Sequence, residues 1–275
     1  MSQPTTRPPV ALTIAGSDSG GGAGIQADLR TFHAFGVFGT TAITAITAQN
    51  TTGVEAVELV SPEMVRAQVD AVCRDLRPSA AKSGMLGNAA VVRACAAGVV
   101  AHGLDRYVLD PVMVATSGDR LLEPEAVAEV RDRLVPLAAI VTPNLPEAAL
   151  LAGRPVESLD DMRAAARELV RRGAGAALVK GGHGAGEEVV DLLLDGHEER
   201  IWRAERIDTP HTHGTGCTLS AAIAAGLAAG APLVEAVDRA LRFTRAAIAA
   251  APGLGEGRGP LDHWVASSDP GSGVG

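Results

Sequence analysis

The feature that most constrains the fold of this 275-residue chain is a regular alternation of short apolar runs with helical patterns. The apolar runs are rich in β-branched residues and have the length of buried strands. They lie at 10–15, 40–47, 79–82, 106–110, 138–142 and 176–180. Between them, apolar residues recur at the 3.6-residue helical period, as at Val65, Val69, Val72 and Leu76. This alternation predicts an α/β fold, a three-layer α/β/α sandwich around a mostly parallel central sheet.

The pattern changes in the last third of the chain. The stretches 189–194 and 200–207 predict an antiparallel hairpin that turns at Asp195–Gly196. A usual domain size of about 150 residues allows one large domain or two small ones. We expect a single domain over residues 10–264, with 1–9 and 265–275 as flexible termini.

Composition excludes several classes of function. The chain carries 24 Lys and Arg against 32 Asp and Glu, a formal charge of −8, and has few aromatic rings. Nucleic-acid binders need a basic face and stacking rings, so we expect no nucleic-acid partner. Its three cysteines form no CxxC pair, which favours a reducing compartment over a disulfide framework. There is neither a secretory signal pattern nor a long apolar run, so we expect a cytoplasmic protein with no membrane partner.

A glycine-rich loop follows the first predicted strand. Residues 16–24 contain glycines that let backbone approach a ligand and expose amides at a helix start. A flexible turn is the simpler interpretation. The spacing Gly22-x-Gly24-x-x-Ala27 also fits a relaxed dinucleotide fingerprint, but that requires an acidic residue after the next strand. Gln49 and Asn50 stand there instead, and no P-loop motif occurs.

A second glycine motif, Gly214-Thr215-Gly216, precedes a predicted Ala-rich helix. Three unhindered amides and the positive end of a helix dipole would form an anion site there. Cys217 follows in the first helical turn, where the thiol pKa is expected to be lowered. The alternative is that Cys217 is a small buried filler. Cys73 and Cys95 lie amid apolar helix positions and are expected in the core.

Charged residues follow three further predicted strands. Asp110 and Glu147 come at neighbouring strand ends and could share hydrated Mg²⁺, although Glu147 could equally support only a helix start. Lys180 could reach a phosphate or could be a solvated strand end. His211 and His213 make a weak metal pair because no further ligand stands nearby in the sequence.

As an ordered set, these motifs resemble the hydroxymethylpyrimidine/phosphomethylpyrimidine kinase family, the thiamine-biosynthesis branch of the ribokinase-like superfamily. The resemblance runs from about residue 10 to about 264. It rests on the segments 11–29, 47–51, 82–87, 110–114, 142–147, 180–183, 213–218 and 257–263.

The resemblance implies ATP-dependent phosphorylation of a pyrimidine hydroxymethyl group and of its monophosphate, with Mg²⁺ and commonly as a homodimer. It implies an anion hole at Gly214, Thr215 and Gly216, with Cys217 as a weak, late proton acceptor. Gln49 matches the position that binds the pyrimidine. The other implied substrate-site residues are Gly16, Ala23, Asp28, Met85 and Val112. Asn144 and Lys180, with Gly214 and Gly216, match the ATP side, and Asp110 and Glu147 match the metal side.

Two positions depart from the family pattern. Thr116 stands where many members have Lys, which would reduce the positive charge over the phosphates, and Arg258 replaces a common His. A pyridoxal kinase is the nearest alternative function, because it too phosphorylates a hydroxymethyl group; Gln49 favours the pyrimidine. A dinucleotide-dependent oxidoreductase and a cysteine hydrolase pairing Cys217 with His213 are more distant alternatives. The sequence leaves open whether one phosphorylation or both take place, with His213 or Lys180 as candidates to neutralise the monophosphate.

Overall fold

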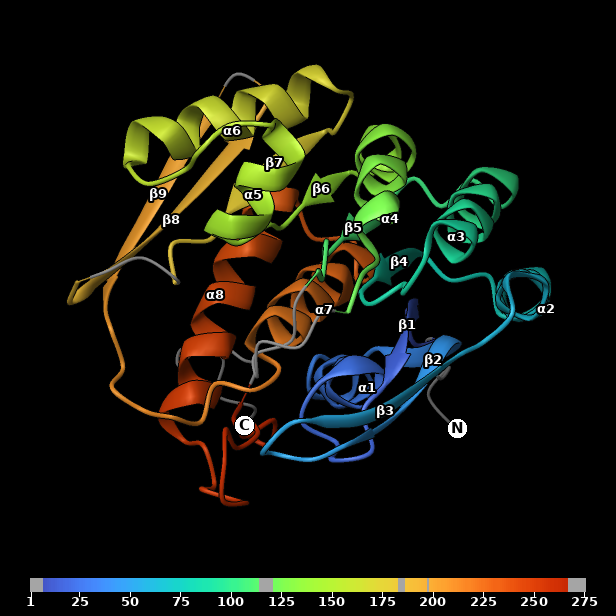
Figure 1. Cartoon of the computed structure of the whole chain (residues 1–275), viewed down its shortest axis with the longest axis horizontal. Helices are drawn as coiled ribbons and strands as arrows, with labels where there is room; N and C mark the ends of the chain where they lie inside the picture. The colour runs from blue at the N-terminus through green and yellow to red at the C-terminus, as the bar shows by residue number, and fades with distance from the viewer. Residues whose placement is uncertain (1–6, 114–120, 183–185, 197, 267–275) are drawn as a thin grey trace, which may run out of the picture.

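The computed structural model describes residues 7–113, 121–182, 186–196 and 198–266. A nine-stranded sheet crosses the molecule in the order β3-β2-β1-β4-β5-β6-β7-β8-β9 (Figure 1). The strands from β2 to β7 in that order run parallel, whereas β3 at one edge and β8 and β9 at the other run antiparallel to their neighbours. This topology confirms the predicted mostly parallel sheet and the terminal hairpin.

The strands are β1 (Val10–Ser17), β2 (Phe38–Gln49), β3 (Val54–Leu59), β4 (Ala80–Ser83), β5 (Tyr107–Leu109), β6 (Ile140–Val141), β7 (Ala176–Val179), β8 (Glu188–Asp195) and β9 (Glu198–Glu205). The α-helices are α1 (Gly24–Ala34), α2 (Pro62–Asp75), α3 (Ala89–Ala101), α4 (Pro124–Glu129), α5 (Leu145–Ala152), α6 (Leu159–Arg171), α7 (Thr215–Ala228) and α8 (Leu233–Ala249). A π-turn, η1 (Val130–Leu134), and a 3₁₀ turn, η2 (Val135–Leu137), continue α4.

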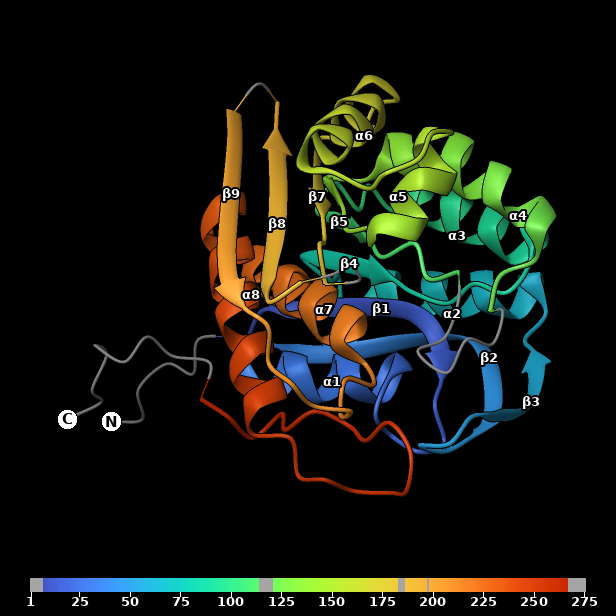
Figure 2. The ribbon, with the colours of Figure 1, turned by 60° about the vertical axis from the view of Figure 1, so that its left-hand side comes forward.

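Helices cover both faces of the sheet, as the two ribbon views show (Figures 1 and 2). On one face α1, α7 and α8 pack on alternate strand residues such as Val108 and Leu178. On the other, the helices from α2 to α6 pack on the intervening residues, such as Leu109 and Val179. Successive side chains of a strand point to opposite faces, so each central strand contributes to both cores. The predicted three-layer α/β/α architecture is confirmed.

Strand β3 is absent from the sequence-based prediction. Its residues are almost all exposed, and it pairs with β2 at the sheet edge through a short turn at residues 50–53. It therefore lacks the buried apolar run that marks the other strands. The predicted strand at 138–142 is also shorter, since β6 covers only Ile140–Val141.

The carboxyl ends of β1, β2, β4, β5, β6 and β7 meet at one edge of the sheet, and the predicted functional residues follow them. This is the edge at which open parallel sheets bind ligands. Within the part of the chain that the structure describes, no helix is long and apolar enough to cross a membrane.

Candidate active site

A cavity of about 1030 Å³ lies along this edge of the sheet. Every residue that the sequence predicted for the site lines it, with one exception, Asp28. The lining residues from that set are Gly16, Ala23, Gln49, Met85, Asp110, Val112, Asn144, Glu147, Lys180, Gly214, Thr215, Gly216 and Cys217. The fold thus gathers loops that are up to two hundred residues apart in sequence into one site.

Asp28 lies behind the cavity rather than in it. Its side chain is fully buried in α1 and accepts hydrogen bonds from Thr13 Oγ1 at 2.6 Å and from Lys82 Nζ at 2.9 Å. Burial opposes the charge of Lys82, but the nearby Asp28, Cys217 and Asp110 together outweigh burial and raise the lysine pKa, while burial raises the pKa of Asp28. Asp28 therefore holds a buried cation under the site and does not face a substrate in the cavity.

The glycine-rich loop is organised by Asp18, a residue that sequence reasoning missed. The Asp18 carboxylate accepts hydrogen bonds from the backbone amides of Gly20, Gly22 and Ala23 at 2.8–3.0 Å. His213 Nε2 lies 2.9 Å from the same carboxylate. Burial favours the neutral acid, yet the hydrogen bonds from His213 and the loop amides hold the pKa of Asp18 below its usual value. The expectation that these loop amides are free for a ligand is therefore wrong.

The second glycine loop does present free amides. Gly214 has φ +85°, and a Cβ there would lie 1.9 Å from the carbonyl oxygen of Gly22, so only glycine allows the two loops to touch. The Thr215 amide donates to the Thr212 carbonyl at 3.3 Å. Within the described chain, the amides of Gly216 and Cys217 donate to no protein acceptor. Two unpaired amides of cavity-lining residues thus remain at the N-terminus of α7, as an anion site requires, whereas the expectation of a free Thr215 amide is wrong.

The charged groups beside these amides come from β5 and β7. A Cβ on Gly216 would lie 3.4 Å from Lys180 Nζ and 3.6 Å from Asp110 Oδ2. Lys180 Nζ is 3.5 Å from Asp110 Oδ1. Ser220 Oγ, on the next turn of α7, lies 3.1 Å from Asp110 Oδ2. The anion site therefore has an ammonium group and a fixed carboxylate at its side.

The Cys217 thiol behaves differently from the prediction. Its pKa is raised to about 11, mainly by burial; the charges of Asp28 and Asp110 act in the same direction, while Lys82 and a hydrogen bond from Gly24 oppose them only in part. The expected lowering by the helix dipole is wrong, because desolvation outweighs it. The thiol consequently keeps its own proton at neutral pH.

Glu147 caps a helix and also lies among the charged groups that line the cavity, so its expected metal role stays a prediction. Its backbone amide donates to Asn144 Oδ1 at 2.9 Å and its carboxylate accepts from the Asn144 amide at 2.9 Å, a complete capping box for α5. Burial raises the pKa of Glu147 to about 7, and the charge of Asp110 acts in the same direction, whereas Lys180 opposes it. Two buried carboxylates that repel each other in this way fit a site for a divalent cation. In the described part of the chain, no group of three or more His, Cys, Asp or Glu side chains could hold a metal alone.

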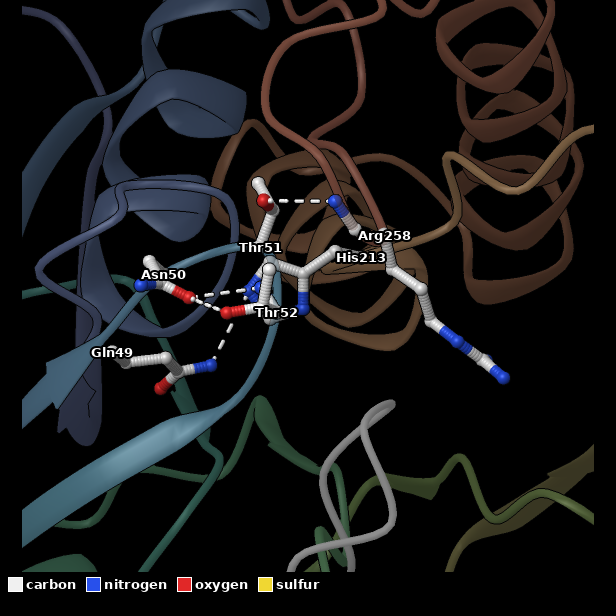
Figure 3. A pocket seen from close by; sticks show the side chains of 7 residues that line it. Gln49, Asn50, Thr51, Thr52, His213 and Arg258 are labelled. Atoms are coloured by element: carbon white, nitrogen blue, oxygen red, sulfur yellow. Dashed lines mark hydrogen bonds between the residues drawn. The ribbon is translucent and has the colours of Figure 1, made fainter.

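Gln49 is the last residue of β2 and lines the cavity. Its Oε1 accepts a hydrogen bond from Thr47 Oγ1 at 3.2 Å, and its Nε2 lies 3.4 Å from His213 Nε2. A smaller cavity of about 260 Å³ opens beside it (Figure 3). That cavity is lined by Gln49, Asn50, Thr51, Thr52, His213, Gly257 and Arg258.

Comparisons with known proteins identify the family. The chain matches the family described as phosphomethylpyrimidine kinase over residues 18–262. The chain belongs to this family. Among curated phosphomethylpyrimidine kinase relatives, a hydroxymethylpyrimidine/phosphomethylpyrimidine kinase from Rhizobium meliloti is 57% identical over 258 residues, which cover 93% of this chain and 97% of the relative.

Two further similarities extend the comparison. A thiamine biosynthesis bifunctional protein from Geobacter sulfurreducens is 48% identical over 94% of this chain, which spans 53% of that longer protein. The crystal structure of an ADP complex of Bacillus subtilis pyridoxal kinase superposes with a TM-score of 0.86 at 39% identity, covering 94% of this chain and 98% of that one. The ribokinase-like kinase fold expected from the resemblance is thus confirmed.

Not every prediction can be placed in this phosphomethylpyrimidine kinase site. Thr116, His183 and the expected flexible residues 1–6 and 267–275 lie outside the described residues. His213 contacts Asp18 and Gln49, and no hydrogen bond joins it to Cys217 in the described chain. The neutral thiol and the separate histidine disfavour the cysteine hydrolase alternative.

Proposed function

We propose that this protein transfers the γ-phosphoryl group of ATP to the hydroxyl of 4-amino-5-hydroxymethyl-2-methylpyrimidine, and then to the resulting monophosphate, for thiamine biosynthesis. One observation carries the proposal. The unpaired amides of Gly216 and Cys217 belong to residues that line one cavity together with Lys180, Asp110 and Gln49. A phosphate-binding site and the Gln49 side-chain amide, which can form hydrogen bonds with a heterocycle, thus line the same cavity.

The residues of this chain supply positioning and charge rather than covalent chemistry. A transferring phosphoryl group passes through a loose transition state, so catalysis rests on alignment and electrostatic stabilisation. The Gly216 and Cys217 amides and the Lys180 ammonium would bind the phosphoryl oxygens. The high thiol pKa leaves Cys217 protonated at rest, so we assign it a contact with the substrate hydroxyl through Sγ and no role as a strong base. In a loose transition state the hydroxyl proton leaves late and can pass to an oxygen of the transferred phosphoryl group, which makes a strong base unnecessary.

We propose Mg²⁺ as the accompanying metal ion. Asp110 and Glu147 would hold it together with phosphate oxygens and water, since Mg²⁺ prefers one or two carboxylates in nucleotide sites. When bound, the ion would neutralise charge on the phosphates. Asn144 would position Glu147, because the backbone amide of Asn144 donates a hydrogen bond to the Glu147 carboxylate.

Recognition of the pyrimidine falls to Gln49. Its amide can donate to a ring nitrogen and accept from an exocyclic amine, which suits an aminopyrimidine. Thr47 donates to its oxygen and thereby fixes which way the amide points. Met85 and Val112 offer apolar contacts along the same cavity wall.

Pyridoxal phosphorylation is the second candidate, favoured by the similarity to the B. subtilis enzyme named pyridoxal kinase. The deciding experiment measures ADP release from the purified protein with ATP and Mg²⁺ and each of three acceptors. These are hydroxymethylpyrimidine, its monophosphate and pyridoxal. We expect turnover of both pyrimidines, with a kcat/KM well above that of pyridoxal. A preference for pyridoxal would refute the assignment.

We further propose that the protein works in the cytoplasm as a homodimer. The three cysteines are free, which suits a reducing compartment. Where β2 and β3 pair, Val57 and Leu59 are exposed on one face of the sheet and Ile46 on the other, apolar side chains that a second copy could cover. Light scattering coupled to gel filtration would report twice the chain mass of 28.0 kDa, and a monomer would contradict the dimer.

A further inference from the structure

The second phosphorylation that we propose poses a charge problem. Its acceptor already carries a phosphate of roughly −1.5 to −2 charge at neutral pH, which must approach the phosphates of ATP. The cavity also contains the carboxylates of Asp110 and Glu147. A cation beyond those needed for ATP would reduce this repulsion, and an unpaired side chain could supply it without first breaking another contact.

Most basic side chains of the cavity are already engaged. Lys180, Arg203 and Arg242 form ion pairs with Asp110, Glu188 and Asp238. Arg206 and Arg245 donate to backbone carbonyls. The cavity's remaining lysine or arginine is Arg258, and within the described residues its guanidinium has no hydrogen-bond or ion-pair partner.

The backbone that carries Arg258 is held against the turn between β2 and β3, and Arg258 lines the cavity. We call residues 253–260 the C-terminal strap. The Arg258 amide donates to the carbonyl of Thr51 at 2.8 Å, and the Gly257 amide donates to Thr51 Oγ1 at 3.2 Å. A Cβ on Gly257 would lie 2.1 Å from the Thr51 carbonyl oxygen, so glycine is required for this contact with the turn between β2 and β3.

The side chain of Arg258 contrasts with its fixed backbone. It is exposed and lines both the main cavity and the smaller one beside Gln49. Figure 3 shows it extended away from Asn50 and Thr52. A guanidinium is permanently charged and offers several donors in a planar fork that matches two phosphate oxygens. A fixed backbone with an unpaired guanidinium is the arrangement that an anion-binding residue needs.

From this placement we propose that Arg258 binds the phosphate of the phosphorylated substrate, a pyrimidine phosphomonoester, and so favours the second phosphoryl transfer over the first. The inference rests on the proposed function. It makes Arg258 a specificity-determining residue, because the alcohol substrate has no group that this guanidinium would bind. The unphosphorylated pyrimidine is held by Gln49 instead.

The test compares Arg258→Gln with the wild-type protein. We expect kcat/KM for the monophosphate to fall at least ~10-fold, mainly through KM, as loss of a charge-assisted bidentate contact predicts. The value for the alcohol should stay within about twofold, and KM for ATP should not change. Arg133→Gln is the matched control, since it removes the same charge from an exposed residue outside both cavities. Arg258→Lys, which keeps the charge without the fork, should recover part of the loss.

Several outcomes would overturn the inference. Equal losses of kcat/KM with both pyrimidines would show that Arg258 has a structural role. A raised KM for ATP with each pyrimidine would show that Arg258 binds ATP. A wild-type protein that phosphorylates the alcohol and not the monophosphate would also refute it while leaving the first step of the proposed function intact. Failure to phosphorylate the alcohol at all would instead refute the proposed function, so the two failures are distinguishable.

Discussion

Replacement of Gly214 by alanine tests the contact between the two glycine loops. Gly214 and Gly230 have nearly the same backbone conformation, with φ of +85° and +87°, at opposite ends of α7. A Cβ on Gly230 meets nothing within 4 Å, whereas one on Gly214 would lie 1.9 Å from the Gly22 carbonyl oxygen. The left-handed conformation costs an alanine about 1–2 kcal/mol at either site. The comparison therefore separates backbone strain from the collision.

The collision sets the size of the expected effect. Such contacts are not found below 3.0 Å, so one loop must retreat by more than 1 Å in Gly214→Ala. A misplacement of about 1 Å in catalytic groups can reduce turnover by ~100-fold. We thus expect Gly230→Ala to lose about 1–2 kcal/mol of stability at nearly wild-type kcat. Gly214→Ala should lose at least as much stability and in addition fall by ~100-fold in kcat.

Urea unfolding would give the stabilities and ADP release would give the turnover of both variants. The decisive quantity is the ratio of kcat values between the two variants when both are folded. If Gly214→Ala turns over as fast as Gly230→Ala, the contact with Gly22 does not position the anion site, and the assignment of the Gly216 and Cys217 amides fails with it.

Three further predictions concern individual side chains. Lys82→Met leaves the buried Asp28 without its counter-charge and should cost about 3–5 kcal/mol in urea unfolding; a loss below about 1 kcal/mol would contradict the buried ion pair. Gln49→Met should weaken equilibrium binding of the pyrimidine by roughly 1–3 kcal/mol, and unchanged affinity would remove Gln49 from the ring site. The Cys217 thiol, with a pKa raised to about 11, should react slowly with iodoacetamide at pH 7.5 and faster as the pH rises towards 11, because only the thiolate reacts. A rate that levels off by about pH 9.5, one unit above the ordinary thiol pKa of about 8.5, would contradict the raised pKa.

Most of the site could be predicted because its residues follow strands that the sequence reveals. Parallel strands end at one edge, so Gln49, Asp110, Asn144 and Lys180 come together once their strands are recognised. Local periodicity was enough for this. Strand β3 was not predicted because its residues are nearly all exposed and an edge strand needs no apolar run.

Side-chain partners across the fold were harder to predict. The helix-dipole argument for Cys217 considered one local effect, whereas desolvation and two nearby carboxylates decide the pKa. The motif position of Asp28 could not show that its carboxylate pairs with Lys82, because Lys82 lies far away in the sequence, in β4. The role of Asp18 could have been found from the local sequence. An aspartate shortly before glycines commonly accepts hydrogen bonds from their backbone amides.

The strap has a consequence for how the protein is made. Its residues 255–259 close against the turn at Thr51, so this contact joins the first fifth of the chain to its last tenth. On the ribosome the strands β1 to β9, which end at Glu205, are synthesised before that stretch emerges, whereas α8 ends at Ala249, only a few residues ahead of it. A nascent chain can therefore form its sheet and still lack the wall that Gly257 and Arg258 provide, so the smaller cavity beside Gln49 is completed only after the strap is translated.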